Sequence, residues 1–489
     1  MKGEETVKLL YVSSEAFPFA ATGGLGDVLG SLPPAVRNLL GEDGDVRVVL
    51  PLYPVIRQKF SAEIRLEKEI VVPLAWRQQY CGIWSAERGG VKFYFLDNEY
   101  YFKRPSFYGS FDDGERFAFF GKAVTEMMRA ISFYPDILHA NDWQSALSVI
   151  YLKRKYAGLP GYRDIRTLYT IHNIEYQGIY DFSILGDVFE LGEEDRGIVE
   201  HNGTVNLTKG AITVSDRVST VSETYARELM TPEYAHGLDG VLRDARHKLC
   251  GIVNGIDVAY YNPESDPALR YPYSAATLTG KDKDKAVLQK MCGFDVRQEV
   301  PLIAMVSRLA SHKGFDLVCC VLEEMLRKDD MQFVLLGTGE PALEDFFREM
   351  TVRYPGKMHA VLKFDKDLSK QIYAGADIFL MPSRSEPCGL SQMIASRYGA
   401  VPIVRETGGL YDTIHPYRAD EDSGNGFTFA AYNAHDMMYV LRQAEALYAD
   451  RCTWRRLMRR AMRTDFSWNA SAQRYLQLYQ SMLTEREFT

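Results

Sequence analysis

Residues 9–34 read LLYVSSEAFPFAATGGLGDVLGSLPP, and this stretch decides the fold of the amino-terminal half. The apolar run at its start predicts a buried strand, and Ala21–Pro34 predicts a glycine-rich turn that opens a helix. Glycines in that turn, Gly24 among them, let backbone approach a ligand closely and present N–H groups at the helix start. Asp27 beside them is suited to bind a hydroxyl. The stretch predicts a βα unit with a cradle for an anion or a sugar.

The same stretch does not match a dinucleotide-binding fingerprint. From Gly24 the pattern reads G-x-G-x-x-x-G, which is one residue too long. Glu15–Thr22 separate it from the strand, and the second strand ends at Leu50-Pro51 without the acid that binds a ribose. These differences exclude a nicotinamide-dependent dehydrogenase.

Apolar runs alternate with amphipathic stretches on both sides of IVNGID (Ile252–Asp257), which predicts parallel sheets built from βαβ units. The clearest expected helices after that phrase are Lys313–Arg327, Leu343–Met350 and Cys388–Tyr398. The expected strands are Leu9–Ser13, Val46–Leu50, Val91–Leu96, Asp136–His139, Thr167–Ile171, Val218–Ser222, Leu302–Val306, Phe333–Leu336, Ala360–Phe364, Ile378–Met381 and Pro402–Val404.

Two successive sets of βα units predict two doubly wound, Rossmann-like α/β domains whose carboxyl-end crevices face each other across a cleft. We expect an amino-terminal domain over residues 1–250, a second domain over 251–465, and a terminal segment, 466–489. The amphipathic helix of that segment, Ser471–Leu483, could pack anywhere, including back on the first domain. The loop Asn262–Lys283 is polar, so we expect it at the surface.

Composition narrows the class of protein. The 489 residues are 46% hydrophobic and 25% charged with a net charge of −8, which is typical of a folded protein and not of a nucleic-acid binder. Seven scattered cysteines without a C-x-x-C pair indicate free thiols in a reducing compartment. The amino terminus lacks signal-peptide features, and no apolar run is long enough to span a membrane. We therefore expect a cytoplasmic protein with no nucleic-acid or membrane partner.

Two basic residues follow the first strand of the second domain, in VSRLASHKG (Val306–Gly314). Arg308 offers a bidentate fork and Lys313 a point charge, a combination suited to a diphosphate that gains negative charge as it leaves. A single such residue would more simply be a solvated surface charge, but two beside one strand end favour a binding role.

The stretch Met381–Val404, MPSRSEPCGLSQMIASRYGAVPIV, is the most specific of the second half. After the strand ends, Glu386-Pro387 turns the chain. At Cys388-Gly389-Leu390-Ser391 we expect a helix to begin, with free N–H groups that hold phosphate oxygens. Glu386 is suited to bind sugar hydroxyls; the simpler alternative is that it caps the helix. Thr407-Gly408-Gly409 forms another close-approach loop at the end of the next strand.

Weaker signals remain. The phrases His139–Trp143 and Ile171–Asn173 each follow a strand, which places their polar groups at a crevice mouth. The aromatic stretch Tyr94–Phe120 is either a sugar-stacking surface or, more simply, core. Asp365-x-Asp367 and Asp282-x-Asp284 match a metal-binding pair in form, but the first opens a helix and the second lies in a charged loop, so we expect no metal.

Taken in order, SSEAFPF, TGGLGD, HANDW, TIHNIEYQG, VNGID, VSRLASHKG, RSEPCGLSQ and DFSW resemble the starch-synthase family of bacterial glycogen synthases, which is glycosyltransferase family 5. The resemblance covers nearly the whole chain. It implies the GT-B fold and transfer of glucose from ADP-glucose to the non-reducing 4-hydroxyl of a glycogen or α-1,4-glucan primer, with retention of configuration. ADP-glucose would be a co-substrate, with no cofactor. The first domain would be on the glucan side and the second on the donor side, and the helix of the terminal segment, 466–489, would cross back to the first domain.

The family resemblance also implies roles for residues. Arg308 and Lys313 would stabilise the leaving diphosphate, Glu386 would hold the glucosyl hydroxyls, and His172 would line the face where the new bond forms. The acceptor contacts would be Asp142, Trp143 and Tyr108. The donor contacts would be Gly24, Asp27, Asn254, Phe364, Cys388, Gly389, Leu390, Ser391, Thr407, Gly408 and Gly409.

One departure from the family pattern leaves alternatives open. The family motif begins with lysine, K-T-G-G-L, where this chain has Ala21, so one cation is missing on the diphosphate side. The alternatives are another retaining GT-B transferase with a different donor or acceptor, or a glucan-binding protein with impaired catalysis.

Overall fold

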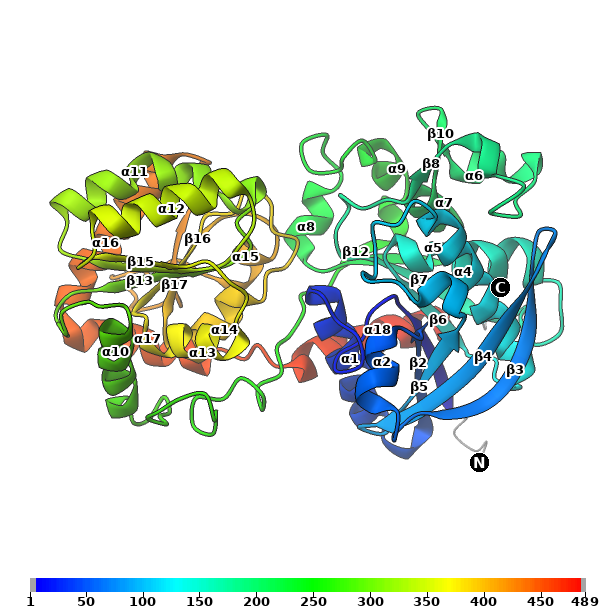
Figure 1. The fold of residues 1–489 in the computed structure, drawn as a ribbon, viewed down its shortest axis with the longest axis horizontal. Coiled ribbons are helices and arrows are strands. Elements are labelled where there is room, and N and C mark those ends of the chain that lie inside the picture. The colour runs from blue at the N-terminus through cyan, green and yellow to red at the C-terminus, as the bar shows by residue number, and fades with distance from the viewer. Residues whose placement is uncertain (1–5, 485–489) are drawn as a thin grey trace. The chain divides into compact units, whose positions relative to one another are not determined.

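The computed structural model describes residues 6–484, which form two α/β units. Among these residues, unit 1 comprises 6–255 and 468–484, and unit 2 comprises Ile256–Ser467 (Figure 1). Each unit is built around its own mainly parallel sheet. The predicted class, two doubly wound α/β domains, is confirmed.

Unit 1 contains a nine-stranded sheet in the order β12-β11-β7-β6-β1-β2-β5-β4-β3. Strands β12 to β5 along this order are parallel, and β5, β4 and β3 pair antiparallel. Nearly continuous apolar runs such as LLYV in β1 form these strands because both faces are buried. The bounds are β1 Val7–Val12, β2 Gly44–Pro51, β3 Arg65–Leu74, β4 Arg77–Arg88, β5 Val91–Asp97, β6 Ile137–Asn141, β7 Arg166–Ile171, β11 Arg217–Thr220 and β12 Leu249–Gly251.

Helices cover the sheet of unit 1, and a second, three-stranded sheet lies outside it. That small sheet has the order β8-β10-β9 (Ile179–Tyr180, Thr204–Asn206, Glu200–His201). The α-helices are α1 Gly24–Leu40, α2 Pro54–Phe60, α3 Glu99–Phe102, α4 Asp113–Ala130, α5 Trp143–Tyr151, α6 Arg196–Val199, α7 Leu207–Val214, α8 Glu223–Glu228, α9 Asp239–Asp244 and α18 Trp468–Thr484.

Unit 2 contains a six-stranded parallel sheet in the order β15-β14-β13-β16-β17-β18, with helices on both faces. In Figure 1, α11 and α12 lie on one face and α13 and α14 on the other. The strands are β13 Leu302–Val306, β14 Gln332–Leu336, β15 Met358–Val361, β16 Ile378–Met381, β17 Val401–Arg405 and β18 Phe427–Phe429. The helices are α10 Thr279–Met291, α11 Phe315–Lys328, α12 Pro341–Arg353, α13 Lys366–Gly375, α14 Ser391–Arg397, α15 Gly408–Thr413, α16 Ala434–Ala449 and α17 Arg451–Arg463.

Both sheets have their topological switch point between the first and fourth parallel strands. Counting only the parallel strands along the chain, the order is 3-2-1-4-5-6-7 in unit 1 and 3-2-1-4-5-6 in unit 2, so the connections diverge between the first and fourth strands of each sheet. These are β1 and β6 in unit 1 and β13 and β16 in unit 2. Ligands of doubly wound sheets bind at the carboxyl ends of such strands.

The structure corrects several details of the sequence prediction. The segment Asn262–Lys283, expected as a surface loop, is partly buried, with Asp266 4% exposed and Lys281 3% exposed, and α10 begins within it at Thr279. Lys313 lies in a short 3-10 turn, Ser311–Lys313, and α11 begins only at Phe315, after the left-handed Gly314. The pair Asp282 and Asp284 lies on α10 and not in a loop, because the apolar side of that helix packs against α13. The β3–β4 hairpin and the small sheet carry no strong period-2 pattern, and the sequence did not indicate them.

The last helix of the chain packs on unit 1 against α1 (Figure 1). Its Tyr479 hydroxyl lies 2.8 Å from the Tyr11 hydroxyl and 2.9 Å from His139 Nδ1, and His139 Nε2 lies 2.6 Å from Thr170 Oγ1. Burial lowers the pKa of His139 well below its ordinary value, so the ring is neutral. His139, expected at a crevice mouth, is instead a buried residue within β6 that ties α18 to the sheet.

Replacing Tyr479 by Phe should destabilise unit 1, because the buried Tyr11 hydroxyl and His139 Nδ1 would each lose their hydrogen-bond partner. We expect the free energy of unfolding to fall by about 1–3 kcal/mol, the scale of an unsatisfied buried group. Urea titration of Tyr479→Phe against wild type measures it. Tyr100→Phe, which changes an exposed tyrosine of the same unit, is the control and should change little. Equal losses in both variants would contradict a special role for Tyr479.

Candidate active site

Polar side chains of unit 2 gather after the carboxyl ends of its first and fourth strands. Arg308 and Lys313 follow β13, and Ser383 and Glu386 follow β16. Lys313 Nζ lies 2.7 Å from Glu386 Oε2, and Ser383 Oγ donates to the same oxygen at 3.0 Å. Glu386 is only 7% exposed, so its carboxylate is fixed by this cation and hydroxyl. The sheet therefore brings two of the predicted site residues into direct contact.

Arg308 differs from Lys313 in its surroundings. Its side chain is exposed, and within residues 6–484 no carboxylate pairs with it. An unpaired guanidinium beside the topological switch point is available for an anion from solution. The end of β13 therefore carries two cations. Lys313 is neutralised by its ion pair with Glu386, and Arg308 is exposed to solvent.

The segment Thr407-Gly408-Gly409 follows β17, but where the sequence predicts a loop, Thr407 is the N-cap of α15 and Gly408 and Gly409 are its first residues. The segment makes the predicted close approach, with the chain itself as the partner. A Cβ on Gly408 would lie 2.0 Å from the carbonyl oxygen of Glu386, and Gly408 has φ +44°. A Cβ on Gly409 would lie 2.2 Å from the Cys388 oxygen. The Gly409 N–H donates to the Glu386 and Pro387 carbonyls, both at 3.1 Å. These glycines therefore set the path of residues 386–388.

The helix after Glu386 begins later than the sequence predicts. The α14 helix starts at Ser391, and Cys388, Gly389 and Leu390 form an irregular turn before it, in which Gly389 has φ +73°. This left-handed glycine and the buried Cys388 delay the helix by three residues. The N–H groups at the helix start are consequently those of Ser391 and the residues after it.

Phe364 lies in the loop between β15 and α13 and is 81% exposed. An apolar ring this open makes no contribution to the core, so it is available as a stacking face. Asp365 beside it caps α13 by accepting the Leu368 N–H at 2.9 Å, as expected for the first of the two D-x-D pairs.

In unit 1, a carboxylate that the sequence reasoning missed shapes the glycine-rich turn. Glu15 is buried and accepts hydrogen bonds from the Thr22 N–H at 2.5 Å, the Thr22 hydroxyl at 2.6 Å and the Tyr108 hydroxyl at 2.7 Å. Gly24 is the exposed first residue of α1, and Asp27 lies in its first turn. The signal was present in the sequence, as an acid directly after a buried strand and before the glycines.

A second polar network follows β6 and β7. The Asp142 carboxylate accepts the His172 N–H at 2.7 Å, and His172 Nε2 lies 2.9 Å from Asn141 Oδ1. Burial lowers the pKa of His172 to about 3 and raises the pKa of Asp142 to about 7. His172 is therefore neutral at neutral pH, and it acts as a hydrogen-bonding group rather than a cation.

The remaining predicted residues of unit 1 are more enclosed. Trp143 is buried against Phe117 and Tyr180, and Tyr108 is half-buried with its hydroxyl on Ser14 and Glu15. Asn254 is buried, and within the described part of the chain its Oδ1 has no hydrogen-bond donor. An unsatisfied buried amide oxygen suggests that a donor from outside the chain completes it.

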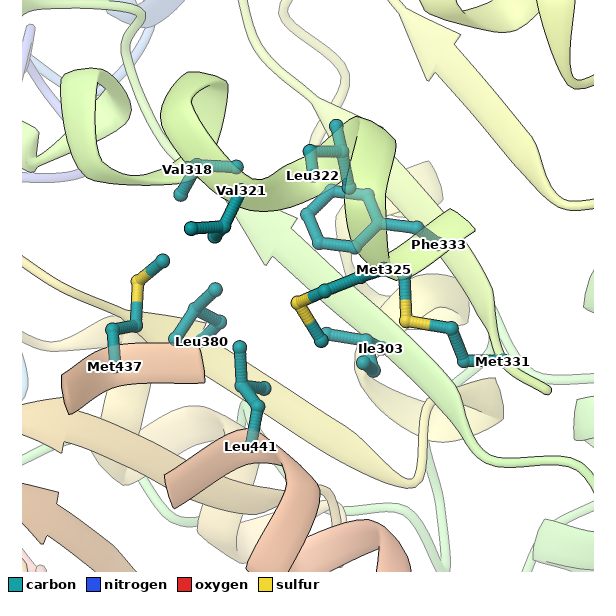
Figure 2. A pocket seen from close by; sticks show the side chains of 10 residues that line it. All are labelled: Ile303, Val318, Val321, Leu322, Met325, Met331, Phe333, Leu380, Met437 and Leu441. Atoms are coloured by element: carbon teal, nitrogen blue, oxygen red, sulfur yellow. The ribbon is translucent and has the colours of Figure 1, made fainter. Parts of the chain in front are cut away.

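The core of unit 2 contains a small void with a volume of about 10 Å³. Figure 2 shows the side chains that line it, all of them apolar, with Ile303, Met325 and Met437 among them. It is a packing gap, since it has room for no more than one water and offers it no polar partner.

Within residues 6–484, no helix is both long and apolar enough to cross a membrane.

Known proteins resemble the chain along its whole length. Residues 8–244 match the model of the starch synthase catalytic domain, and residues 294–458 match that of the glycosyl transferases group 1. A glycogen synthase of Geobacillus thermodenitrificans is 47% identical over 99% of both chains, and one of Bacillus cereus is 45% identical over 98% of this chain and 100% of its own. The catalytic domain of Starch Synthase IV from Arabidopsis thaliana, solved with ADP and acarbose, superposes with a TM-score of 0.89 at 34% identity, covering 98% of this chain and 100% of that one.

Substituting Ala for Gly409 should disturb the Glu386 segment without touching a polar side chain. The new Cβ overlaps the Cys388 backbone, so residues 386–388 must shift. We expect the thermal midpoint of unit 2 to fall by several degrees. Gly356→Ala is the matched control, because a Cβ there meets nothing within 4 Å. A Gly409→Ala protein as stable as the control would show that the loop adapts freely.

Proposed function

The chain belongs to the glycogen synthase family of glycosyltransferases, and from this premise we propose that it transfers glucose from ADP-glucose to the non-reducing end of an α-1,4-glucan with retention of configuration. The family membership expected from the motifs is confirmed by full-length relatives at 47% identity. The donor, the acceptor and the stereochemistry are the proposal.

The contact between Lys313 and Glu386 is the observation that carries the proposal. Lys313 is paired with the buried carboxylate of Glu386 at the topological switch point, and the exposed Arg308 follows the same strand, β13. When the glycosidic bond to the diphosphate breaks, negative charge grows on the leaving oxygens. Cations that are already in place stabilise this charge without reorganisation. In the proposed reaction Arg308 and Lys313 meet the diphosphate, while Glu386 accepts hydrogen bonds from the glucosyl hydroxyls.

Several features support ADP-glucose as donor. The Arabidopsis starch synthase was solved with ADP, a product of such a reaction. In this chain Phe364 offers an open ring for an adenine, and the N–H groups around Gly389–Ser391 are assigned to the diphosphate. The Thr407 and Gly409 N–H groups donate to carbonyls within the chain, so the segment Thr407–Gly409 would serve the donor by fixing the path of residues 386–388. The orphan Asn254 oxygen, with Gly24 and Asp27, would complete the donor contacts from unit 1. ADP-glucose is then a co-substrate, and no cofactor is required.

The acceptor side is assigned to unit 1. Asp142, Trp143 and Tyr108 would contact the glucan, and the neutral His172 would line the reacting face. A retaining transfer on one face of the sugar needs no second carboxylate as nucleophile, and the attacking hydroxyl passes its proton to the departing phosphate oxygen. The acarbose in the Arabidopsis structure is a glucan-like ligand of that protein and supports a glucan acceptor here.

Nucleotide release by the purified protein tests the proposal directly. We expect ADP release from ADP-glucose only when glycogen is present, and weaker release of UDP from UDP-glucose. Preference for UDP-glucose would overturn the donor, and turnover without stimulation by glycogen would overturn the acceptor. Silence with both donors would favour a glucan-binding protein impaired by Ala21, and Ala21→Lys would then restore release.

Variants of the ion pair test its role. We expect Glu386→Gln to lower kcat by about a hundredfold or more, the scale of one preorganised polar group, and Lys313→Met to do likewise. Because the two side chains touch, the double variant should lose much less than the product of the single losses. Glu324→Gln on the exposed face of α11 is the control and should keep full activity. Strictly multiplicative losses would mean that the two residues act independently.

A further inference from the structure

The turn between β3 and β4 presents an indole ring at the surface of unit 1. Trp76 is 74% exposed, whereas the other four tryptophans, all within the described residues, are buried or half-buried. None of the roles proposed above uses this residue.

The exposed ring is nevertheless held in one orientation. Its Nε1 donates to Asp187 Oδ1 at 2.6 Å, and the Arg77 guanidinium lies 4.5 Å from its centroid. Arg77 is itself fixed by ion pairs of 3.1 Å to Glu115 and to Asp187, and its side chain is only 10% exposed. One face of the indole is thus backed by a cation, and the exposed area belongs to the rest of the ring.

The turn that carries the ring departs from what a tight hairpin favours. Its two residues are Ala75 and Trp76, and Ala75 has φ +52°, a conformation that favours Gly or Asn. The Ala75 N–H donates to Glu190 Oε2 at 3.1 Å, and Glu190 also pairs with Lys122 at 3.0 Å. A strained turn tied down at two points to hold an apolar ring in water has no explanation in packing, and such strain is typical of functional positions.

We propose that the open face of Trp76 is a second carbohydrate site, which binds an α-glucan chain by stacking on the apolar face of a glucose ring. The identity of the polymer rests on the proposed function. A flat, immobilised indole loses little conformational entropy on binding, and the half-exposed Asp187 carboxylate beside it can accept hydroxyl hydrogens. A polymer held at one point presents its chain ends at a raised local concentration, which aids a transferase without new contacts at the reacting bond.

Fluorescence of the unmodified protein tests the site without any turnover. Acrylamide quenches exposed indoles, and Trp76 is the one tryptophan of the chain that is exposed. We expect maltoheptaose, with no donor present, to reduce the quenching. Unchanged quenching at glucan concentrations that saturate glycogen binding would overturn the proposal. This measurement is independent of catalysis, so failure of the proposed transfer reaction and failure of this site give different results.

Variants add a second test. We expect Trp76→Ala to weaken glycogen binding about three- to tenfold, the scale of one aromatic contact, and Trp76→Phe to recover part of it. The KM for glycogen should rise, while kcat and the KM for maltotriose stay unchanged. Tyr439→Ala on α16, which removes another exposed ring, is the control and should bind as wild type. Equal binding by Trp76→Ala and wild type would show that the ring merely anchors the hairpin.

Discussion

The contact of the Gly408–Gly409 backbone with residues 386–388 is the constraint on which the site of unit 2 depends. Only residues without a Cβ allow the end of β17 to lie this close to the segment that follows β16. This packing fixes the Glu386 backbone, and Lys313, which follows β13, then fixes its carboxylate. The segments that follow β13, β16 and β17 therefore hold one another in place without a ligand. Electrostatic preorganisation requires such a fixed arrangement of charged groups.

Unit 1 reaches a comparable rigidity by different means. Its turn after β1 is organised by the buried Glu15, which accepts three hydrogen bonds, and its strand ends after β6 and β7 are joined through Asp142 and His172. No cation is involved in either network. The last helix, held through Tyr479, adds the terminal segment of the chain to the same sheet.

The sequence predicts what depends on local pattern. The buried parallel strands are continuous apolar runs, so their positions, the two-domain class and the family motifs are all readable. It does not predict what depends on contacts between distant residues. The late start of α14 follows from the left-handed Gly389, the ion pair of Lys313 with Glu386 joins residues 73 positions apart, and Glu15 acquires its role only when Tyr108 folds over it. Edge features such as the β3–β4 hairpin lack a clear period because much of their surface faces water.

The two units divide the electrostatic work of the proposed reaction. Unit 2 holds the charged groups, Arg308, Lys313 and Glu386, where a diphosphate would gain charge as it leaves. Unit 1 offers His172, which burial keeps neutral, and Asp142, whose pKa of about 7 leaves its charge only partly expressed at neutral pH. An attacking sugar hydroxyl is itself neutral, and a strong fixed charge beside it would favour water or ions over the sugar. In the proposed reaction the acceptor would therefore meet a neutral histidine and a partly ionised carboxylate, while the leaving group would meet the fixed charges of unit 2.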